Sequence, residues 1–233
     1  MKMILFILTI FLSAVSFGQD KVGHGSDSEG CDSSGIGLVT TWVKPITSEC
    51  GETVTIFGEE YPVVQIGDQC WLGKNLHYND SEGGVSSYGN NSTISSVYGY
   101  LYSWDAASRI DGLISGWHLP SIEEIKTLLN NIDPDHYTSE EGSEMYPNAT
   151  EYLKESGINH WNTANGSNQS GLTLLGAGQI YKGESLDLKN FIVIWSNENN
   201  YGLAVFDTND AISDNAFDII DEYVLLSVRL IKD

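Results

Sequence analysis

Basic residues are scarce in this chain. Its 233 residues include 11 Lys and Arg against 32 Asp and Glu, which gives a formal net charge of −21 at pH 7. Nucleic acid and anionic membrane surfaces repel such a chain at long range, and it has too few cations to build a strong basic patch. The composition therefore argues against a nucleic-acid partner. It is typical of a protein kept soluble outside the cell, and it leaves open the binding of divalent cations.

Long hydrophobic runs are also missing, apart from one at the N-terminus. The run from Met3 to Val15 is too short to span a bilayer. It follows Lys2 and precedes the small residues Ser16 and Gly18, which is the layout of a secretory signal peptide. We therefore expect residues 1–18 to be a signal peptide, with no membrane span after its cleavage. The expected location is secreted or at the cell surface.

The motifs of several common enzyme classes are absent. No Walker, GxGxxG or GxSxG element occurs in the sequence. Neither HExxH nor HxH spacing, which would favour a catalytic zinc site, occurs among the five histidines, His24, His77, His118, His136 and His160. We expect a protein that is not an enzyme. A hydrolase using paired carboxylates, such as Glu123–Glu124 or Glu140–Glu141, is one alternative, although the required separation is a three-dimensional matter.

The chain divides into two zones of different composition. Residues 19–49 begin with Gly, Ser and Asp and offer little to bury, apart from the short extended segment LVTTWVKPI at Leu38–Ile46. From Cys50 onward the chain has enough apolar and aromatic material for one sizeable core. We therefore expect a flexible leader at 19–49 and a single folded domain at 50–233.

Short runs of β-branched and aromatic residues alternate with Gly, Asn and Asp. Thr53–Phe57 and Tyr61–Ile66 predict a hairpin that turns at about Gly58–Glu60. Val97–Ile110 predicts an aromatic strand followed by a short helical turn. Further strands are predicted at the runs QCWLGKNL, FIVIWS, YGLAVFD and YVLLSVRLI.

The clearest helix signal lies in SGWHLPSIEEIKTLLNNI. Pro120 disfavours helix at the residue before it, and Ser121 with Glu124 forms a capping box, so the helix should begin at Ser121. The apolar residues that follow recur on one helical face, at Ile122, Ile125, Leu128, Leu129 and Ile132. A second, weaker helix is predicted at Asn148–Ser156. Two helices among short antiparallel strands and long loops predict an α+β fold.

The motifs QCW, NL, GWHLP and SVR occur in an order that resembles the Fibrobacter succinogenes major paralogous domain, over roughly Cys50–Asp233. The resemblance implies an exported domain of unestablished activity, found at or beyond the bacterial cell surface. More remotely, the step GWHLPS into a helix is similar to the C-type-lectin-like fold and to formylglycine-generating sulfatase modifiers, which implies a C-type-lectin-like architecture.

Two departures limit what the resemblance carries over. Family members often have Cys after the SVR motif, whereas this chain has Leu230. The oxidase relatives depend on a reactive cysteine pair late in the fold, and no cysteine follows Cys70 here. Copper-dependent formylglycine chemistry is therefore not expected.

Candidate ligand-binding residues lie in polar loops, because loops carry binding residues more often than packed elements do. We predict the site in the loops Tyr78–Val97 and Asn197–Asn215, and not at Trp117, which should be a packed aromatic. The first loop could instead be a disordered insertion. The run Trp195–Glu198 is a loose echo of the Trp-Asn-Asp step of calcium-dependent lectins. The candidates, including two sugar-stacking rings, are Tyr78, Tyr88, Asn197, Glu198 and Asn199.

The loop Asp207–Asn215 concentrates oxygen ligands and makes calcium the candidate cofactor. It lacks the spacing and the glycine of an EF-hand, so a solvated acidic loop is the alternative. The candidate metal ligands are Asp207, Asn209, Asp210 and Asp214.

Three cysteines, in a chain expected to be exported, predict one disulfide and one cysteine left over. Cys50 and Cys70 lie equally far from the predicted hairpin turn, so we predict a bridge between them across its open end. The alternative pairs Cys31 with Cys50 and leaves Cys70 reduced and buried.

These observations favour an exported, non-catalytic binding or adhesion module whose ligand is a glycan or another cell-surface polymer. The alternative of a different class is a structural or surface-display protein without a small-molecule ligand. The sequence does not indicate the oligomeric state.

Overall fold

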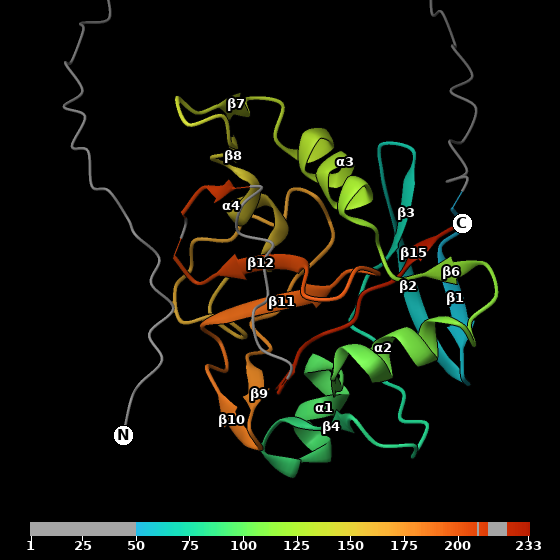
Figure 1. Cartoon of the computed structure of the whole chain (residues 1–233). Helices are drawn as coiled ribbons and strands as arrows, with labels where there is room; N and C mark the ends of the chain where they lie inside the picture. Colours follow the sequence, from blue (N-terminus) through green and yellow to red (C-terminus); the bar gives the residue numbers. More distant parts are fainter. Residues whose placement is uncertain (1–49, 209, 214–222) are drawn as a thin grey trace, which may run out of the picture. The chain divides into compact units, whose positions relative to one another are not determined.

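The largest sheet joins the beginning of the folded region to its end. A computed structural model describes residues 50–208, 210–213 and 223–233. Within these residues, five antiparallel strands pair in the order β1-β2-β3-β15-β6 (Figure 1). They are β1 (Thr53–Ile56), β2 (Glu59–Ile66), β3 (Gln69–Leu72), β6 (Trp117–His118) and β15 (Ile231–Lys232). The predicted signal peptide, leader and Cys31 lie outside the described residues.

Smaller antiparallel sheets surround this one. One hairpin pairs β11 (Phe191–Trp195) with β12 (Gly202–Phe206), and the sequence predicts a strand at each of these two runs. The other strands form short ladders. One joins β4 (Val85–Ser86) to β5 (Leu101–Tyr102), and another joins β9 (Gln179–Tyr181) to β10 (Glu184–Leu186) and β14 (Val224–Leu225). A third joins β8 (Glu144–Tyr146) to β7 (Tyr137–Thr138) and β13 (Ile212–Ser213).

The described residues contain four α-helices and one short 3-10 helix, η1 (Tyr88–Asn90), whereas the sequence predicts two helices and one short helical turn. The α-helices are α1 (Ser92–Tyr98), α2 (Trp104–Asp111), α3 (Ile122–Ile132) and α4 (Ala149–Leu153). The sequence STISSVY of α1 has weak helix propensity, so pattern alone does not reveal it. Helices and antiparallel strands together confirm the α+β class. Among the described residues, no helix is long and apolar enough to cross a membrane.

Helix α3 begins as its sequence predicts. The Ser121 hydroxyl accepts from the Glu124 amide, and the Glu124 carboxylate accepts from the Ser121 amide, which completes the capping box. Four of the five predicted apolar residues are buried, and only Ile122 is half-buried. The Glu124 side chain also contacts His118, whose Nε2 lies 3.0 Å from Glu124 Oε1 and whose Nδ1 lies 2.7 Å from Asp233 Oδ1.

One fully buried arginine ties distant segments together. Arg229 Nη1 donates to the carbonyls of Leu72 and Leu172, each at 2.9 Å, while Nε and Nη2 both donate to Asn75 Oδ1. Asn75 in turn donates to the Tyr98 carbonyl at the end of α1. One hydrogen-bonded network thereby joins the end of β3, the segment before β15 and the loop before β9.

The structure contains the predicted disulfide between Cys50 and Cys70, with Cα atoms 5.4 Å apart. The hairpin geometry from which we predict this bridge is wrong. The hairpin turns at Phe57–Gly58, and Cys70 lies on the following strand β3, where it pairs with Gln65 of β2. The bridge therefore links the segment before β1 to β3, and β2 lies between β1 and β3 in the sheet.

Removal of this bridge by the double substitution Cys50→Ser and Cys70→Ser should lower the free energy of unfolding by about 3 kcal/mol, because the unfolded chain regains the entropy of a loop closed over 20 residues. Urea unfolding of the oxidised protein measures it. A Cys31→Ser variant is the control and should keep the bridge. Peptide mapping that finds Cys31 joined to Cys50 would contradict the pairing.

Protonation of His118 should make stability pH-dependent. Partial burial lowers the pKa of His118, but the hydrogen bonds and charges of Asp233 and Glu124 outweigh it and raise the pKa overall. A raised folded-state pKa gives stability that is fully present below the unfolded value of about 6.5 and is lost as pH rises through the folded value.

The free energy of unfolding of wild type should therefore exceed that of His118→Gln by more at about pH 5.5 than at about pH 8.5. Gln keeps a polar side chain without the titrating charge, and urea unfolding at both pH values measures the difference. A difference that is equal at the two pH values, or larger at the higher one, would show that the His118 ion pairs contribute nothing.

Candidate functional site

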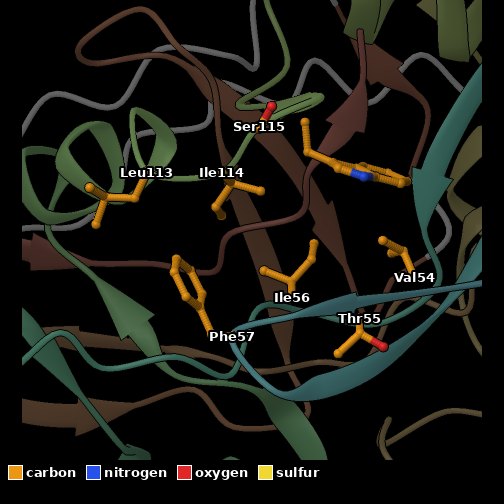
Figure 2. Close-up of a pocket in the computed structure, with 8 residues that line it drawn as sticks. Val54, Thr55, Ile56, Phe57, Leu113, Ile114 and Ser115 are labelled. Atoms are coloured by element: carbon orange, nitrogen blue, oxygen red, sulfur yellow. The ribbon is translucent and has the colours of Figure 1, made fainter.

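A groove of about 210 Å³ lies beside β1, the edge strand of the large sheet (Figure 2). Residues Val54–Phe57 line one side, and Leu113–Ser115 after α2 line another, together with Trp117 of β6. Strands β1 and β6 are opposite edges of the sheet in pairing order. Because both contribute to one groove, the sheet must coil until its two edges approach each other.

Six of the eight residues that line this groove are apolar, and some of them are exposed. Figure 2 shows Phe57 and Ile56 projecting toward Ile114 and Leu113. Phe57 is 42% exposed and Leu113 is 57% exposed, whereas Ile56 is buried. Exposed apolar side chains gathered at a concave surface are typical of binding sites rather than of a solvated surface.

The turn that carries Phe57 is strained. Phe57 has a φ of 50° and Gly58 a φ of 83°, so both central residues of this two-residue hairpin turn are left-handed. Asn, Asp and Gly are the usual residues in such turns, because a bulky side chain with positive φ costs about 1–3 kcal/mol. A Phe at such a position, outside the buried core, points to a role for its exposed ring.

Two pairs of stacked rings involve the groove residue Phe57 and the segment His77–Tyr78. The Phe57 ring stacks on Tyr78, with centroids 3.6 Å apart and planes at 14°. His77, the residue before Tyr78, stacks on Tyr100 at 4.6 Å and 9°. We call these four residues, Phe57, His77, Tyr78 and Tyr100, the aromatic platform. Backbone contacts fix it, since the Tyr78 amide donates to the Tyr102 hydroxyl at 3.1 Å.

A partly exposed carboxylate lies beside the platform. Glu59 Oε1 accepts from Lys74 Nζ at 2.6 Å, and Oε2 lies 2.8 Å from His77 Nδ1. Partial burial raises the pKa of Glu59, but the hydrogen bonds and charges of Lys74 and His77 outweigh it and hold the pKa below its usual value. Beneath them, burial raises the pKa of Tyr61 to about 12, so its hydroxyl stays protonated. Polar groups thus border the stacked rings.

The predicted ligand-binding residues lie on different elements. Tyr78 belongs to the platform, whereas Tyr88 lies in η1 and packs against the core. The loop of Tyr88 is attached to β10, since the Gly89 amide donates to Ser185 Oγ. The exposed residues Asn197, Glu198 and Asn199 follow β11, and the Asn197 amide donates to the Pro120 carbonyl ahead of α3. The structure thus attaches the two loops to different elements.

Two groove residues have roles that the sequence did not indicate. Trp117 is buried, as expected of a packed aromatic, but it also lines the groove, whereas the predicted binding site lies in other loops. The sequence pattern places Phe57 only at the end of a strand. The signal available in the sequence was the pair Phe-Gly at a tight turn, where Asn-Gly would be usual.

The described part of the predicted metal loop is engaged in internal contacts. Asp207 Oδ1 accepts from the amides of Asn162 and Thr163, and lies 3.8 Å from the buried Lys154 ammonium. Asp210 Oδ2 accepts from the Thr208 hydroxyl. Among the described residues, no group of three or more His, Cys, Asp or Glu is placed to hold a metal. Asn209 and Asp214 lie outside the described residues.

The carboxylate pairs of the hydrolase alternative lie away from the groove. Glu124 is occupied by the capping box and His118, and Glu123 lies 3.7 Å from Lys126. Glu140 and Glu141 are exposed in the turn between β7 and β8. Neither pair lines the groove.

Comparison with known proteins gives one match. The model of a family described as Fibrobacter succinogenes major domain matches residues 64–232, well over half of the chain. No protein of curated function and no solved structure matches significantly.

Substitution of Phe57 should separate turn strain from ring stacking. Phe57→Asn loses the stack, worth about 0.5–1.5 kcal/mol, but relieves a left-handed strain of similar size, so the free energy of unfolding should change by less than about 1 kcal/mol. Phe57→Val loses the stack and keeps the strain. Urea unfolding should therefore find the Val variant less stable than the Asn variant by about 1 kcal/mol. Equal stability, or a more stable Val variant, would contradict a strained turn.

Proposed function

The chain belongs to the Fibrobacter succinogenes major domain family, and from that premise we propose that it is an exported, non-catalytic module that binds a carbohydrate or similar surface polymer on its groove and aromatic platform. The observation that carries the proposal is the exposed Phe57 ring, held in a strained turn against Tyr78 and facing an apolar groove.

The chemistry of this surface suits a sugar. A sugar ring has apolar C–H faces, which stack on aromatic rings, and peripheral hydroxyls, which need hydrogen-bond partners. Phe57 and Tyr78 supply rings, and Glu59, Lys74 and His77 supply charged and polar groups beside them. The stacked rings are already in place, so binding would require little further ordering of side chains.

Two further observations support the wider proposal. The Cys50–Cys70 bridge fits export, because disulfides persist in oxidising compartments. A C-type-lectin-like arrangement, which we propose for the fold, is supported by the step from Trp117 through Pro120 into the capped helix α3 and by the short antiparallel strands. Calcium stays a candidate cofactor for the loop that contains Asp207, and this sugar site does not require it.

The binding proposal predicts a specific pair of outcomes. The oxidised protein, applied to a glycan array that includes bacterial surface polysaccharides, should retain at least one class of glycan. In calorimetry with that glycan, Phe57→Ala should weaken binding by about tenfold or more, equivalent to about 1.4 kcal/mol. Phe206→Ala is the matched control, because Phe206 on β12 is also 42% exposed but lies outside the groove.

The control should bind as wild type does. Protein that retains no glycan would favour the structural or surface-display role instead. A loss of affinity in Tyr88→Ala, with none in Phe57→Ala, would move the site to the loop that the sequence favours.

A further inference from the structure

The groove beside β1 is lined by a tryptophan whose indole N–H has no hydrogen-bond partner. The N–H groups of Trp71, Trp161 and Trp195 each donate to an oxygen of another residue. Trp117 lines the groove and is only 7% exposed, yet its Nε1–H has no acceptor among the described residues. Because a buried indole N–H usually finds a partner, this unused donor needs an explanation.

The indole N–H of Trp117 keeps contact with the solvent. Within the described part of the chain, Trp104 Nε1 is the one side-chain nitrogen or oxygen that is both enclosed and unpaired. Trp117 Nε1 is also unpaired, so it is not fully enclosed. Because Trp117 lines the groove, an acceptor placed in the groove can reach this N–H.

The free edge of β1 adds a backbone donor and a backbone acceptor. In the two-residue hairpin, Ile56 and Glu59 form the hydrogen-bonded pair nearest the turn. Hydrogen-bonded and non-hydrogen-bonded pairs alternate, so the next pair, Thr55 and Glu60, exchanges no hydrogen bonds. The N–H and C=O of Thr55 therefore point away from β2, and neither has a backbone partner among the described residues.

These backbone groups lie along the groove. Figure 2 shows the side chains of Val54 and Ile56 on one side of β1 and that of Thr55 on the other, as the alternation of a strand requires. All three residues line the groove, so the groove follows the edge of the strand rather than one of its faces. Thr55 is exposed, which leaves its backbone accessible to a ligand.

The rest of the lining is uncharged. Val54, Ile56 and Ile114 add apolar side chains, and none of the described residues that line the groove carries a charge. The groove volume of about 210 Å³ is several times the roughly 30 Å³ that one water occupies in the liquid. A neutral group with an apolar part, one donor and one acceptor suits this lining, because an unpaired charge is costly to move out of water.

We infer that the groove recognises the acetamido group of an N-acetylated sugar. The acetamido carbonyl oxygen accepts from Trp117 Nε1–H, and the acetamido N–H donates to the Thr55 carbonyl. The methyl group packs against Val54 and Ile56, and the sugar ring extends toward Phe57. The inference rests on the proposed sugar site and names the class of sugar that this site takes.

NMR of the wild-type protein tests the contact directly. Tri-N-acetylchitotriose is titrated into the full-length oxidised protein, and cellotriose, a neutral trimer with hydroxyls in place of the acetamido groups, is the matched control. The Nε1–H signal of Trp117 should shift and saturate with the acetylated trimer only. The signals of Trp161 and Trp195, which donate within the protein, should stay unchanged. No saturable shift at Trp117, or an equal shift with cellotriose, would overturn the inference.

The substitution Trp117→Phe removes the N–H and keeps an aromatic ring. In calorimetry, wild type should bind tri-N-acetylchitotriose about tenfold or more tightly than cellotriose. Trp117→Phe should lower this ratio by about fivefold, the effect of one neutral hydrogen bond. A ratio near one in wild type, or a ratio unchanged in the variant, would contradict the inference. The wild-type NMR titration decides the matter if the variant does not fold.

The outcomes separate this inference from the proposed function. Glycans bound through Phe57 with no preference for the acetamido group would keep the sugar site and overturn only the acetamido specificity. A protein that binds no glycan would overturn both. A trialanine peptide carries similar amides without a sugar ring and should not bind. A saturable shift of Trp117 with this peptide alone would overturn the inference and indicate a protein partner.

Discussion

The buried guanidinium of Arg229 is the constraint on which the rest of the structure depends. Moving a cation out of water costs several kcal/mol unless hydrogen bonds replace its hydration. Here the replacement comes from Leu72, Asn75 and Leu172, which lie far from Arg229 in sequence. Those segments must all be in place for the charge to be tolerated. The neighbouring Gly99 is part of the same constraint, because a Cβ there would lie 2.7 Å from that of Asn75.

This constraint reaches the aromatic platform through a few residues. Just after Asn75, the Leu76 amide donates to the Val228 carbonyl, and the Leu76 carbonyl accepts from the Tyr100 amide. His77 and Tyr78 follow immediately, so the segment that presents their rings is fixed from both sides. The β1–β2 hairpin brings Phe57 onto Tyr78 from another direction. The packed core thus holds these rings in place, which suits the binding role that we propose.

Local signals in the sequence predicted local structure well. Neighbouring residues determine the capping box of Ser121 and Glu124 and the strand-forming runs of β11 and β12. The structure confirms both the capped helix and the two strands. The Cys50–Cys70 pair was predicted from an incorrect hairpin register. Cys70 lies on β3, after a second turn, and not on the second strand of the predicted hairpin. Tertiary contacts account for what was missed: α1 has little intrinsic helix propensity, and the groove unites β1 with β6, which are distant in sequence. The role of Arg229 likewise depends on partners that no pattern of spacing reveals.

The claim that the Phe57 ring is displayed to contact a ligand is tested most directly by NMR of the wild-type protein with a glycan that it retains. Ring-proton signals are assigned and followed during the titration. The ring protons of Phe57 and Tyr78 should shift together and saturate with the same affinity, while those of Tyr88 stay unchanged. Saturable shifts confined to Tyr88 and the amides of Asn197–Asn199, with Phe57 unaffected, would contradict the assignment of the site.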